Sequence, residues 1–234
     1  RYGEDGYIQS LLENEKVKYT HSGPLASSIA IDKEISKNIF VKKNILTPKY
    51  FKFKFNKFKN KSELKKKIKS KLSFPVVIKP FNEGSSVEVY ICSEKNFFKN
   101  LNKLTLYREV MIEKYIPGRE IQVAIMGKRK LGAIELVPKR KFYDYQAKYN
   151  AKSKTKHIIP VKINNKKLKE VLNIASKAHK IIGCKGVTRS DFKFYKDKFY
   201  LLEINTQPGM TSLSLVPEIA RFRNISFLNL IDWI

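Results

Sequence analysis

Lys79 and the turn after it form the first of three small groups whose residue types and spacing suit phosphate or metal chemistry. Lys79 lies in a β-branched run, FPVVIKP at 74–80, and Gly84, Ser85 and Ser86 follow. A lysine beside free backbone N–H groups and hydroxyls can hold phosphate oxygens. Since many hairpins also end in Gly-Ser, the same residues are typical of an ordinary turn.

The second group contains Asp191, Glu203 and Asn205. Glu203 and Asn205 are two residues apart on an expected strand and therefore share a face. A hairpin around residues 196–198 would bring Asp191 to the same side. Oxygen ligands of this kind suit Mg²⁺. The alternative is a set of polar surface residues, but the apolar neighbours at 201–204 favour the metal interpretation.

The third group is Glu113-Lys114 with Glu120 seven residues later. Taken alone, these residues are typical of an exposed ion pair that contributes little to stability.

All three groups lie in longer stretches that resemble the D-alanine–D-alanine ligases, a family with the ATP-grasp fold. The pattern LE-x-N-T-x-PGMT-x-x-SLVP is the most specific of them. The matching stretches are GEDGYIQSLLE at 3–13, SGPLASSIAIDKEISK at 22–37, FPVVIKPFNEGSSVEV at 74–89, EKYIPGRE at 113–120, FYDYQAKY at 142–149, TRSDF at 188–192 and LLEINTQPGMTSLSLVP at 201–217.

The resemblance implies an α+β ATP-grasp fold, in which two α+β subdomains with antiparallel sheets grip ATP between them. Residues 1–24 would be a remnant of the N-terminal substrate lobe. Residues 25–113 would form the central subdomain, and residues 114–234 the C-terminal one with the metal and D-alanine sites.

The resemblance also assigns residues to ATP and to metal. Lys37 and Lys79 would contact the phosphates, with Lys33 as a competitor of Lys37. Asp191, Glu203 and Asn205 would hold two Mg²⁺ ions, with Mn²⁺ as an alternative. The other expected nucleotide contacts are Ser86, Glu113, Lys114, Ile116, Glu120, Lys148 and Leu202.

The implied reaction is ATP-dependent joining of two D-alanines through an acyl phosphate, for peptidoglycan precursors. Positioning and charge neutralisation dominate such a phosphoryl transfer, so no nucleophilic side chain is required. Arg189 would stabilise the transferring phosphate, and the backbone N–H of Gly209 would bind the oxyanion. The remaining expected residues are Ser214 and Leu215 for the carboxylate of the second D-alanine, and Ser85 and Tyr149 for closure over the substrates.

Three departures from the family pattern stand out. The chain begins inside the family's HG-x-x-GEDG motif, so the N-terminal lobe that orients the first D-alanine is expected to be missing from it. Glu88 and Thr188 each replace a usual glycine. A remnant that binds Mg-ATP without joining D-alanines is therefore the alternative function.

Hydrophobic periodicity predicts the elements that must position these residues. We expect helices at 7–13, 26–43, 62–71, 94–104 and 166–182, and two short ones at the C-terminal end. We expect strands at 50–55, 74–80, 87–92, 109–113, 119–127, 130–137, 186–195 and 198–204. The polar segment 138–160 has no periodicity, which is typical of a lid or binding loop.

The composition adds a further alternative, because 48 Lys and Arg against 21 Asp and Glu give a net charge of +27. A basic protein of this kind could bind nucleic acid or an anionic membrane. Against this, 40 of the 48 cations are lysines, which indicates a dispersed charge, so we expect neither partner. In YFKFKF at 50–55, aromatic stacking on single strands competes with a half-buried strand, which we favour.

Cellular location follows from three sequence features. The first ten residues are polar and acidic, no run of 18 apolar residues occurs, and only two cysteines are present. We therefore expect a cytoplasmic protein, with a homodimer implied by the resemblance. Cys92 and Cys184 are interpreted as small apolar residues, and His21, His157 and His179 as incidental to catalysis.

Overall fold

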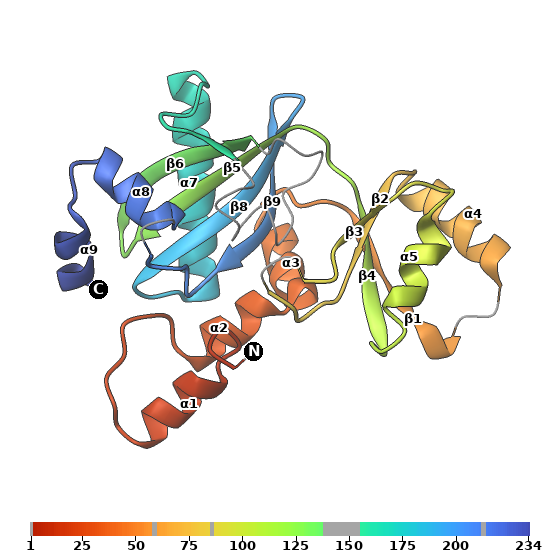
Figure 1. The fold of residues 1–234 in the computed structure, drawn as a ribbon, viewed down its shortest axis with the longest axis horizontal. Coiled ribbons are helices and arrows are strands. Elements are labelled where there is room, and N and C mark those ends of the chain that lie inside the picture. Colours follow the sequence, from red (N-terminus) through yellow and green to blue (C-terminus); the bar gives the residue numbers. More distant parts are fainter. Residues whose placement is uncertain (1, 58–59, 85–86, 138–154, 212–213) are drawn as a thin grey trace. The chain divides into compact units, whose positions relative to one another are not determined.

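The computed structural model describes residues 2–57, 60–84, 87–137, 155–211 and 214–234. The chain folds as two compact units (Figure 1). One unit, which we call the large unit, contains residues 1–47 and 118–234, and the other, the small unit, contains residues 48–117.

The small unit is a four-stranded antiparallel sheet in the order β1-β4-β2-β3, with two helices. Its elements are β1 (Tyr50–Lys54), a 3-10 turn (Phe55–Lys57), α4 (Lys61–Lys71), β2 (Val76–Lys79), β3 (Tyr90–Cys92), α5 (Phe97–Lys103) and β4 (Glu109–Lys114). Val76 and Ile78 of β2 pack with Leu64 and Ile68 of α4 in one buried cluster. Since side chains alternate along a strand, Val77 and Lys79 point to the opposite face.

The sheet of the large unit has five antiparallel strands in the order β7-β6-β5-β8-β9. These strands are β5 (Arg119–Met126), β6 (Arg129–Val137), β7 (Lys156–Ile158), β8 (Val187–Tyr195) and β9 (Lys198–Asn205). The helices of this unit are α1 (Tyr7–Asn14), α2 (Pro24–Ile31), α3 (Lys33–Lys42), α7 (Asn165–Ile182), α8 (Leu215–Phe222) and α9 (Phe227–Trp233).

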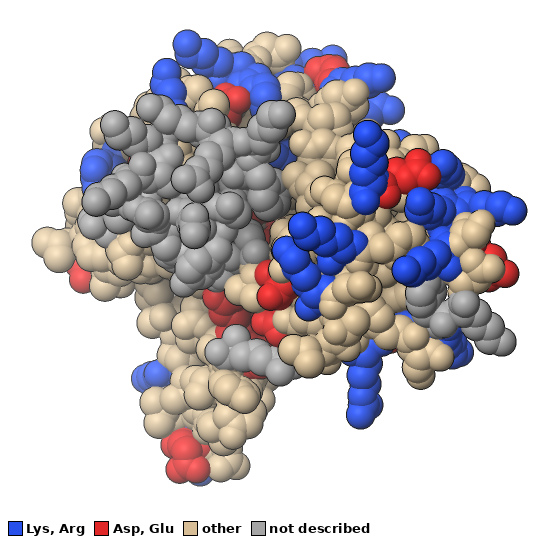
Figure 2. Space-filling model, turned by 45° about the vertical axis from the view of Figure 1, so that its right-hand side comes forward, with Lys and Arg blue, Asp and Glu red and all other residues tan. Residues whose placement is uncertain are grey.

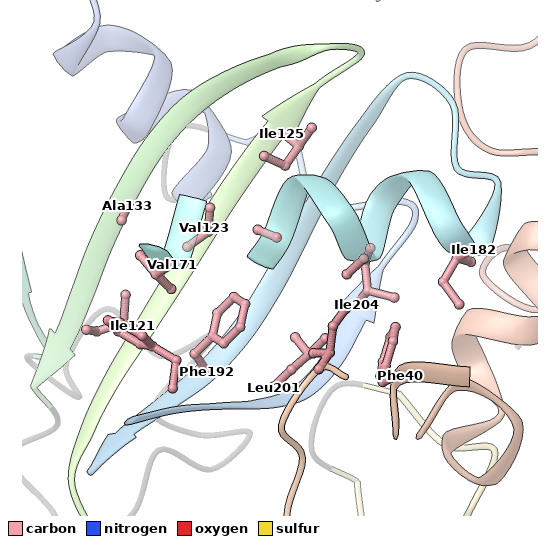
Figure 3. Close-up of a cluster of buried hydrophobic side chains, with 14 of the residues drawn as sticks. Phe40, Ile121, Val123, Ile125, Ala133, Val171, Ile182, Phe192, Leu201 and Ile204 are labelled. Atoms are coloured by element: carbon pink, nitrogen blue, oxygen red, sulfur yellow. The ribbon is translucent and has the colours of Figure 1, made fainter. Parts of the chain in front are cut away.

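One face of the large sheet is covered by α7, with α2 and α3 beside it. Val171 and Ile182 of α7 pack against Ile121, Phe192 and Ile204 of the strands (Figure 3). The other face carries α8, whose Val216 and Ile219 pack on Ile134 of β6. The apolar stripe of each helix therefore decides which strand positions remain for polar side chains.

A β-bulge interrupts the pairing of β8 with β9. Asp191 pairs with Glu203, but the next pair is Phe192 with Leu201, so Leu202 has no opposite residue. A bulge inserts one residue and re-aims the side chains that follow. As a result, both Leu201 and Ile204 lie in the α7 core although they are three residues apart.

The observed elements confirm the expected α+β class and most of the expected strands and helices. YFKFKF forms strand β1, with Phe53 buried, as the half-buried interpretation predicts. The single helix expected at 26–43 was wrong, because Asp32 ends α2 and caps α3 by accepting from the N–H groups of Glu34 and Ile35. The expected structureless stretch 138–160 contains β7 at its end.

The division into units differs from the expected boundaries at 24/25 and 113/114. Residues 25–47 belong to the large unit because α2 and α3 contact β9 and α7. The second boundary lies between Pro117 and Gly118.

Charge is spread over the face drawn in Figure 2, where Lys and Arg side chains occur in several places with acidic side chains among them. Within the described ranges no helix is long and apolar enough to cross a membrane.

Candidate functional site

The β8–β9 hairpin builds the acidic group that the sequence predicts. Lys196 and Asp197 both have positive φ, the conformation of a two-residue hairpin turn. The register places Asp191 opposite Glu203 and Arg189 opposite Asn205. Cross-strand partners and residues two apart share one face, so all four side chains lie on the face opposite α7.

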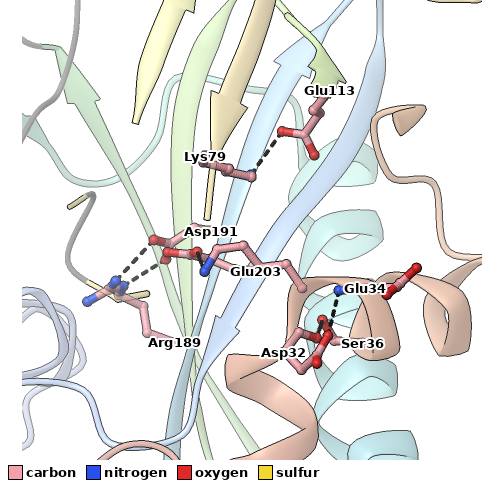
Figure 4. Close-up of polar contacts among 9 residues, drawn as sticks. Asp32, Glu34, Ser36, Lys79, Glu113, Arg189, Asp191 and Glu203 are labelled. Carbon is pink, nitrogen blue, oxygen red and sulfur yellow. Dashed lines mark hydrogen bonds and ion pairs between the residues drawn. The ribbon is translucent and has the colours of Figure 1, made fainter. Parts of the chain in front are cut away.

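Arg189 and Asp191 form a bidentate ion pair along one strand (Figure 4). Arg189 Nε donates to Asp191 Oδ1 at 2.7 Å and Nη2 donates to Oδ2 at 3.0 Å. Their side chains are 15% and 7% exposed. An arginine fork on a carboxylate is among the stronger charged contacts in proteins, so both oxygens of Asp191 face a cation in this structure.

Glu203 faces a second cation, Lys33, whose Nζ lies 3.7 Å from Glu203 Oε2. Lys33 is the first residue of α3, and the Asp32 cap fixes where that helix begins. Lys37 lies one turn further on, fully buried, and its Nζ donates to Thr47 Oγ1 at 2.5 Å. Lys33, one of the two lysines weighed for the phosphate role, therefore lies beside the acidic group.

The oxygen donors on this face fit a divalent cation. Asp191 and Glu203 supply carboxylates, and Asn205 Oδ1, which accepts from the N–H of Gln207 at 2.8 Å, keeps a second lone pair. Gln122, the register partner of Asp191 on β5, has a buried side-chain oxygen without a hydrogen-bond partner among the described residues. Such a donor set, with oxygen ligands alone, suits Mg²⁺ or Mn²⁺.

Gln122 was not among the predicted site residues. Its signal in the sequence was weak, since it is one polar residue in the apolar run IQVAIM at 121–126.

The small unit places Lys79 and Glu113 together. Lys79 Nζ donates to Glu113 Oε1 at 2.9 Å across neighbouring strands, with side chains 8% and 3% exposed (Figure 4). The predicted alternative of an exposed ion pair at Glu113 is therefore wrong. Lys114 has an exposed side chain, and Ile116 is buried.

Glu120 and Leu202, the other described nucleotide candidates, lie in the large unit. Glu120 accepts from Lys193 Nζ at 2.9 Å, and Leu202 is the bulged residue. The expected residues Ser85, Ser86, Lys148 and Tyr149 lie outside the described residues.

Gly209 and Ser214, expected at the oxyanion and the second D-alanine, are neighbours. A Cβ on Gly209 would lie 2.9 Å from Ser214 Oγ, so a side chain here would crowd the hydroxyl. Ser214 is the residue before α8, and its Oγ accepts from the N–H of Thr211 at 2.9 Å. Leu215 is the first residue of α8, where backbone N–H groups have no partner inside the helix and can bind an anion.

The two departures at usual glycines are accommodated differently. Thr188 is fully buried and its Oγ1 lies 2.8 Å from His179 Nδ1. Glu88 has a positive φ of 54° and accepts a hydrogen bond from the hydroxyl of Tyr90. The pKa of Tyr90 is raised to about 12. The hydrogen bond to Glu88 is the larger cause of this rise, and burial of the side chain is the second.

Comparison with known proteins decides the family. A family model described as D-ala D-ala ligase C-terminus matches residues 39–234. The D-alanine–D-alanine ligase of Pelagibacter ubique (strain HTCC1062) is 65% identical over 234 residues, which cover 100% of this chain and 76% of that protein. The chain belongs to the D-alanine–D-alanine ligase family.

Two other members of the D-alanine–D-alanine ligase family are also similar to this chain. The enzyme of Wolbachia pipientis wMel is 45% identical over 98% of this chain and 72% of its own length. The crystal structure of D-alanine–D-alanine ligase from Bacillus anthracis complexed with ATP superposes with a TM-score of 0.83 at 30% identity, over 100% of this chain and 74% of that one. The fold is therefore the ATP-grasp fold of these ligases.

Proposed function

We propose that this chain uses ATP to join two D-alanines into D-alanyl-D-alanine. The main support for the proposal is the polar face of the β8–β9 hairpin. It occurs in a chain that is 65% identical to a protein named D-alanine–D-alanine ligase. Arg189, Asp191, Glu203 and Asn205 share that face, and they are the residue types that phosphoryl transfer requires.

In the first step, a carboxylate oxygen of one D-alanine attacks the γ-phosphorus of ATP, and ADP leaves. Arg189 stabilises the negative charge of the transferring phosphoryl group. Asp191, Glu203 and Asn205 would hold Mg²⁺, which neutralises phosphate charge when it is bound. Lys37 is assigned to the phosphates with Lys33 as its competitor; Lys33 lies 3.7 Å from Glu203, and Lys37 donates to Thr47.

In the second step, the amine of the other D-alanine attacks the acyl carbon and inorganic phosphate leaves, while the amine loses a proton. The backbone N–H of Gly209 donates to the oxyanion. Ser214 Oγ and the N–H of Leu215 bind the carboxylate of this acceptor. The short distance between Gly209 and Ser214 Oγ supports these roles, because the acyl carbon and the acceptor carboxylate are a few bonds apart in the product.

Family resemblance assigns six of the described residues to the nucleotide: Lys79, Glu113, Lys114, Ile116, Glu120 and Leu202. The reaction supplies the dipeptide for peptidoglycan precursors, and we propose that it takes place in the cytoplasm. A homodimer stays a prediction, which light scattering would test.

The test is dipeptide synthesis by the complete gene product with ATP, Mg²⁺ and D-alanine. We expect phosphate release and D-alanyl-D-alanine in equal amounts, with neither product from L-alanine. Asp191→Asn should reduce the rate at least about 100-fold. The matched control is Asp197→Asn in the hairpin turn, where Asp197 pairs with Lys167 and Asn tolerates the positive φ. ATP binding without dipeptide would favour the remnant instead.

A further inference from the structure

A hydrogen bond joins β7 to α8 on the face of the large sheet that carries the proposed acceptor residues. His157 Nδ1 lies 2.6 Å from Glu218 Oε2, and the two side chains are 27% and 31% exposed. An ionised carboxylate only accepts hydrogen bonds, so Nδ1 is the donor. The reaction steps above assign no role to either residue.

The other contacts that hold α8 on the sheet are apolar. Leu215, Val216, Ile219 and Ala220 are buried in one cluster with residues of β6. Ile219 Cγ2 would lie 3.1 Å from a Cβ at Gly132, so the helix rests closely on that strand, as Figure 1 shows for α8 and β6. Apolar contacts have little directionality, whereas a short hydrogen bond fixes distance and angle.

Glu218 lies one turn after Ser214, and its backbone N–H donates to the Ser214 carbonyl oxygen at 3.3 Å. Moving Glu218 along or around the helix axis would therefore move Ser214 and the N–H of Leu215 as well. His157 is on the short edge strand β7, which pairs only with β6 among the described strands. The bond thus ties the start of α8 to the edge of the sheet.

The negative charge of Glu218 gives its hydrogen bond with His157 a second consequence. The carboxylate of Glu218 is in the first turn of α8, and the N-terminus of a helix attracts anions. An acceptor carboxylate at Ser214 and Leu215 would occupy the same helix end, and two negative charges there repel each other. His157 holds the Glu218 carboxylate at β7 and supplies its N–H donor.

We infer that His157 and Glu218 are positioning residues for the acceptor D-alanine, acting through the start of α8. The inference rests on the proposed function. It predicts a selective change in the Michaelis constant of the acceptor, because the groups assigned to ATP lie on other elements.

The experiment measures initial rates with D-alanine varied at saturating ATP, and with ATP varied at saturating D-alanine, so that donor and acceptor constants are fitted separately. His157→Gln should raise the acceptor KM about fivefold and leave the KM for ATP unchanged. His157→Asn, whose side-chain nitrogen superposes on Nδ1, should stay within about twofold of the wild type. Glu218→Gln should also stay near the wild type, since its amide oxygen still accepts.

A matched control is Lys167→Ala, which removes the contacts of Lys167 with Glu170 and Asp197 elsewhere in the same unit and should change no KM. Melting temperatures of all variants are measured in parallel. Equal changes in both KM values, or a lower melting temperature with an unchanged acceptor KM, would overturn the inference and leave the proposed function unaffected. A wild-type protein that makes no dipeptide would overturn the proposed function, and the inference with it.

Discussion

Each unit holds a cation and a carboxylate that the proposed function uses, but the two pairs are constructed differently. Lys79 and Glu113 come from neighbouring strands and meet through one contact of 2.9 Å. Arg189 and Asp191 come from one strand, two residues apart, and meet through two contacts of 2.7 and 3.0 Å. The first pair is 8% and 3% exposed, and the second 15% and 7%.

The difference indicates how easily each cation can change partner. Lys79 bridges two strands, so its contact with Glu113 contributes to the sheet itself. Arg189 and Asp191 already share a strand, and separating them by rotation of the arginine side chain leaves the backbone unchanged. We therefore expect the Lys79 pair to stay together, so that its loss destabilises the sheet, and the Arg189 pair to exchange when a metal ion arrives at Asp191.

The largest expected effect is that of Lys79→Met on stability. It leaves Glu113 buried without this cation, which costs about 3 kcal/mol. The free energy of unfolding from urea titration measures it, with Lys66→Met on the exposed face of α4 as the control. Adding Glu113→Gln should restore part of the loss. Equal stabilities of the Lys79 and Lys66 variants would contradict the comparison.

Next in size is the effect of Arg189→Met on metal affinity. Because the ion pair no longer competes for Asp191, Mn²⁺ should bind about tenfold more tightly in the absence of nucleotide. Electron paramagnetic resonance of free Mn²⁺ measures the Kd. Arg119→Met is the matched control, since Arg119 also makes a bidentate pair in this sheet, with Glu135 at 2.7 and 2.6 Å. Unchanged affinity in the Arg189 variant would show that the pair does not exchange.

A smaller effect is expected at Thr188, which precedes Arg189 in β8 and contacts His179 on the opposite face. Thr188→Val removes the partner of His179 and should cost about 1 kcal/mol, whereas Thr188→Ser should cost less because it keeps a hydroxyl. Chemical denaturation of the two variants side by side would distinguish them, and equal losses would argue against the hydrogen bond.

His179 also gives stability a pH dependence. Burial lowers its pKa from 6.5, so the folded state binds fewer protons than the unfolded chain. Its contribution is present above pH 6.5 and is lost as the pH falls below that value toward the lowered pKa. Urea midpoints between pH 7 and about 5 should decline, and less steeply in His179→Gln. Burial lowers the pKa of His21 too, so part of the slope should remain.

The smallest expected effect is at Glu88, the corresponding departure in the small unit. Glu88→Gly relieves a positive φ of 54° but removes the hydrogen bond to Tyr90, so stability should change by only a few tenths of a kcal/mol. The pKa of Tyr90, raised to about 12, should fall toward 10. Ultraviolet titration of tyrosinate measures this, and an unshifted Tyr90 would contradict the assigned partner.

Local patterns in the sequence were sufficient for much of this fold. The period-2 alternation predicted that Glu203 and Asn205 share a face, and the Lys196-Asp197 turn predicted the hairpin that brings Asp191 to them. Apolar periodicity likewise predicted α7, which is observed at Asn165–Ile182. These features depend on residues that are close in sequence.

The partners of the charged residues could not be predicted in the same way. Lys33 and Glu203 are 170 positions apart and meet only because α3 packs against β9. The three-residue strand β7 lacks a periodicity of its own and is defined by pairing with β6. The start of α3 could have been found, since Asp32 followed by Glu34 is typical of a helix cap.

The bulge at Leu202 constrains the number of residues in β9 as well as their types. It allows Leu201 and Ile204 to face α7 while Glu203 and Asn205 face the other side. Deleting Leu202 would place Leu201 next to Glu203, and regular alternation would still keep Leu201 toward α7 and Glu203 toward the other face. A further inserted residue would instead turn the side chains before it to the opposite faces of the sheet. Over generations, this strand can therefore lose its extra residue more readily than it can gain another.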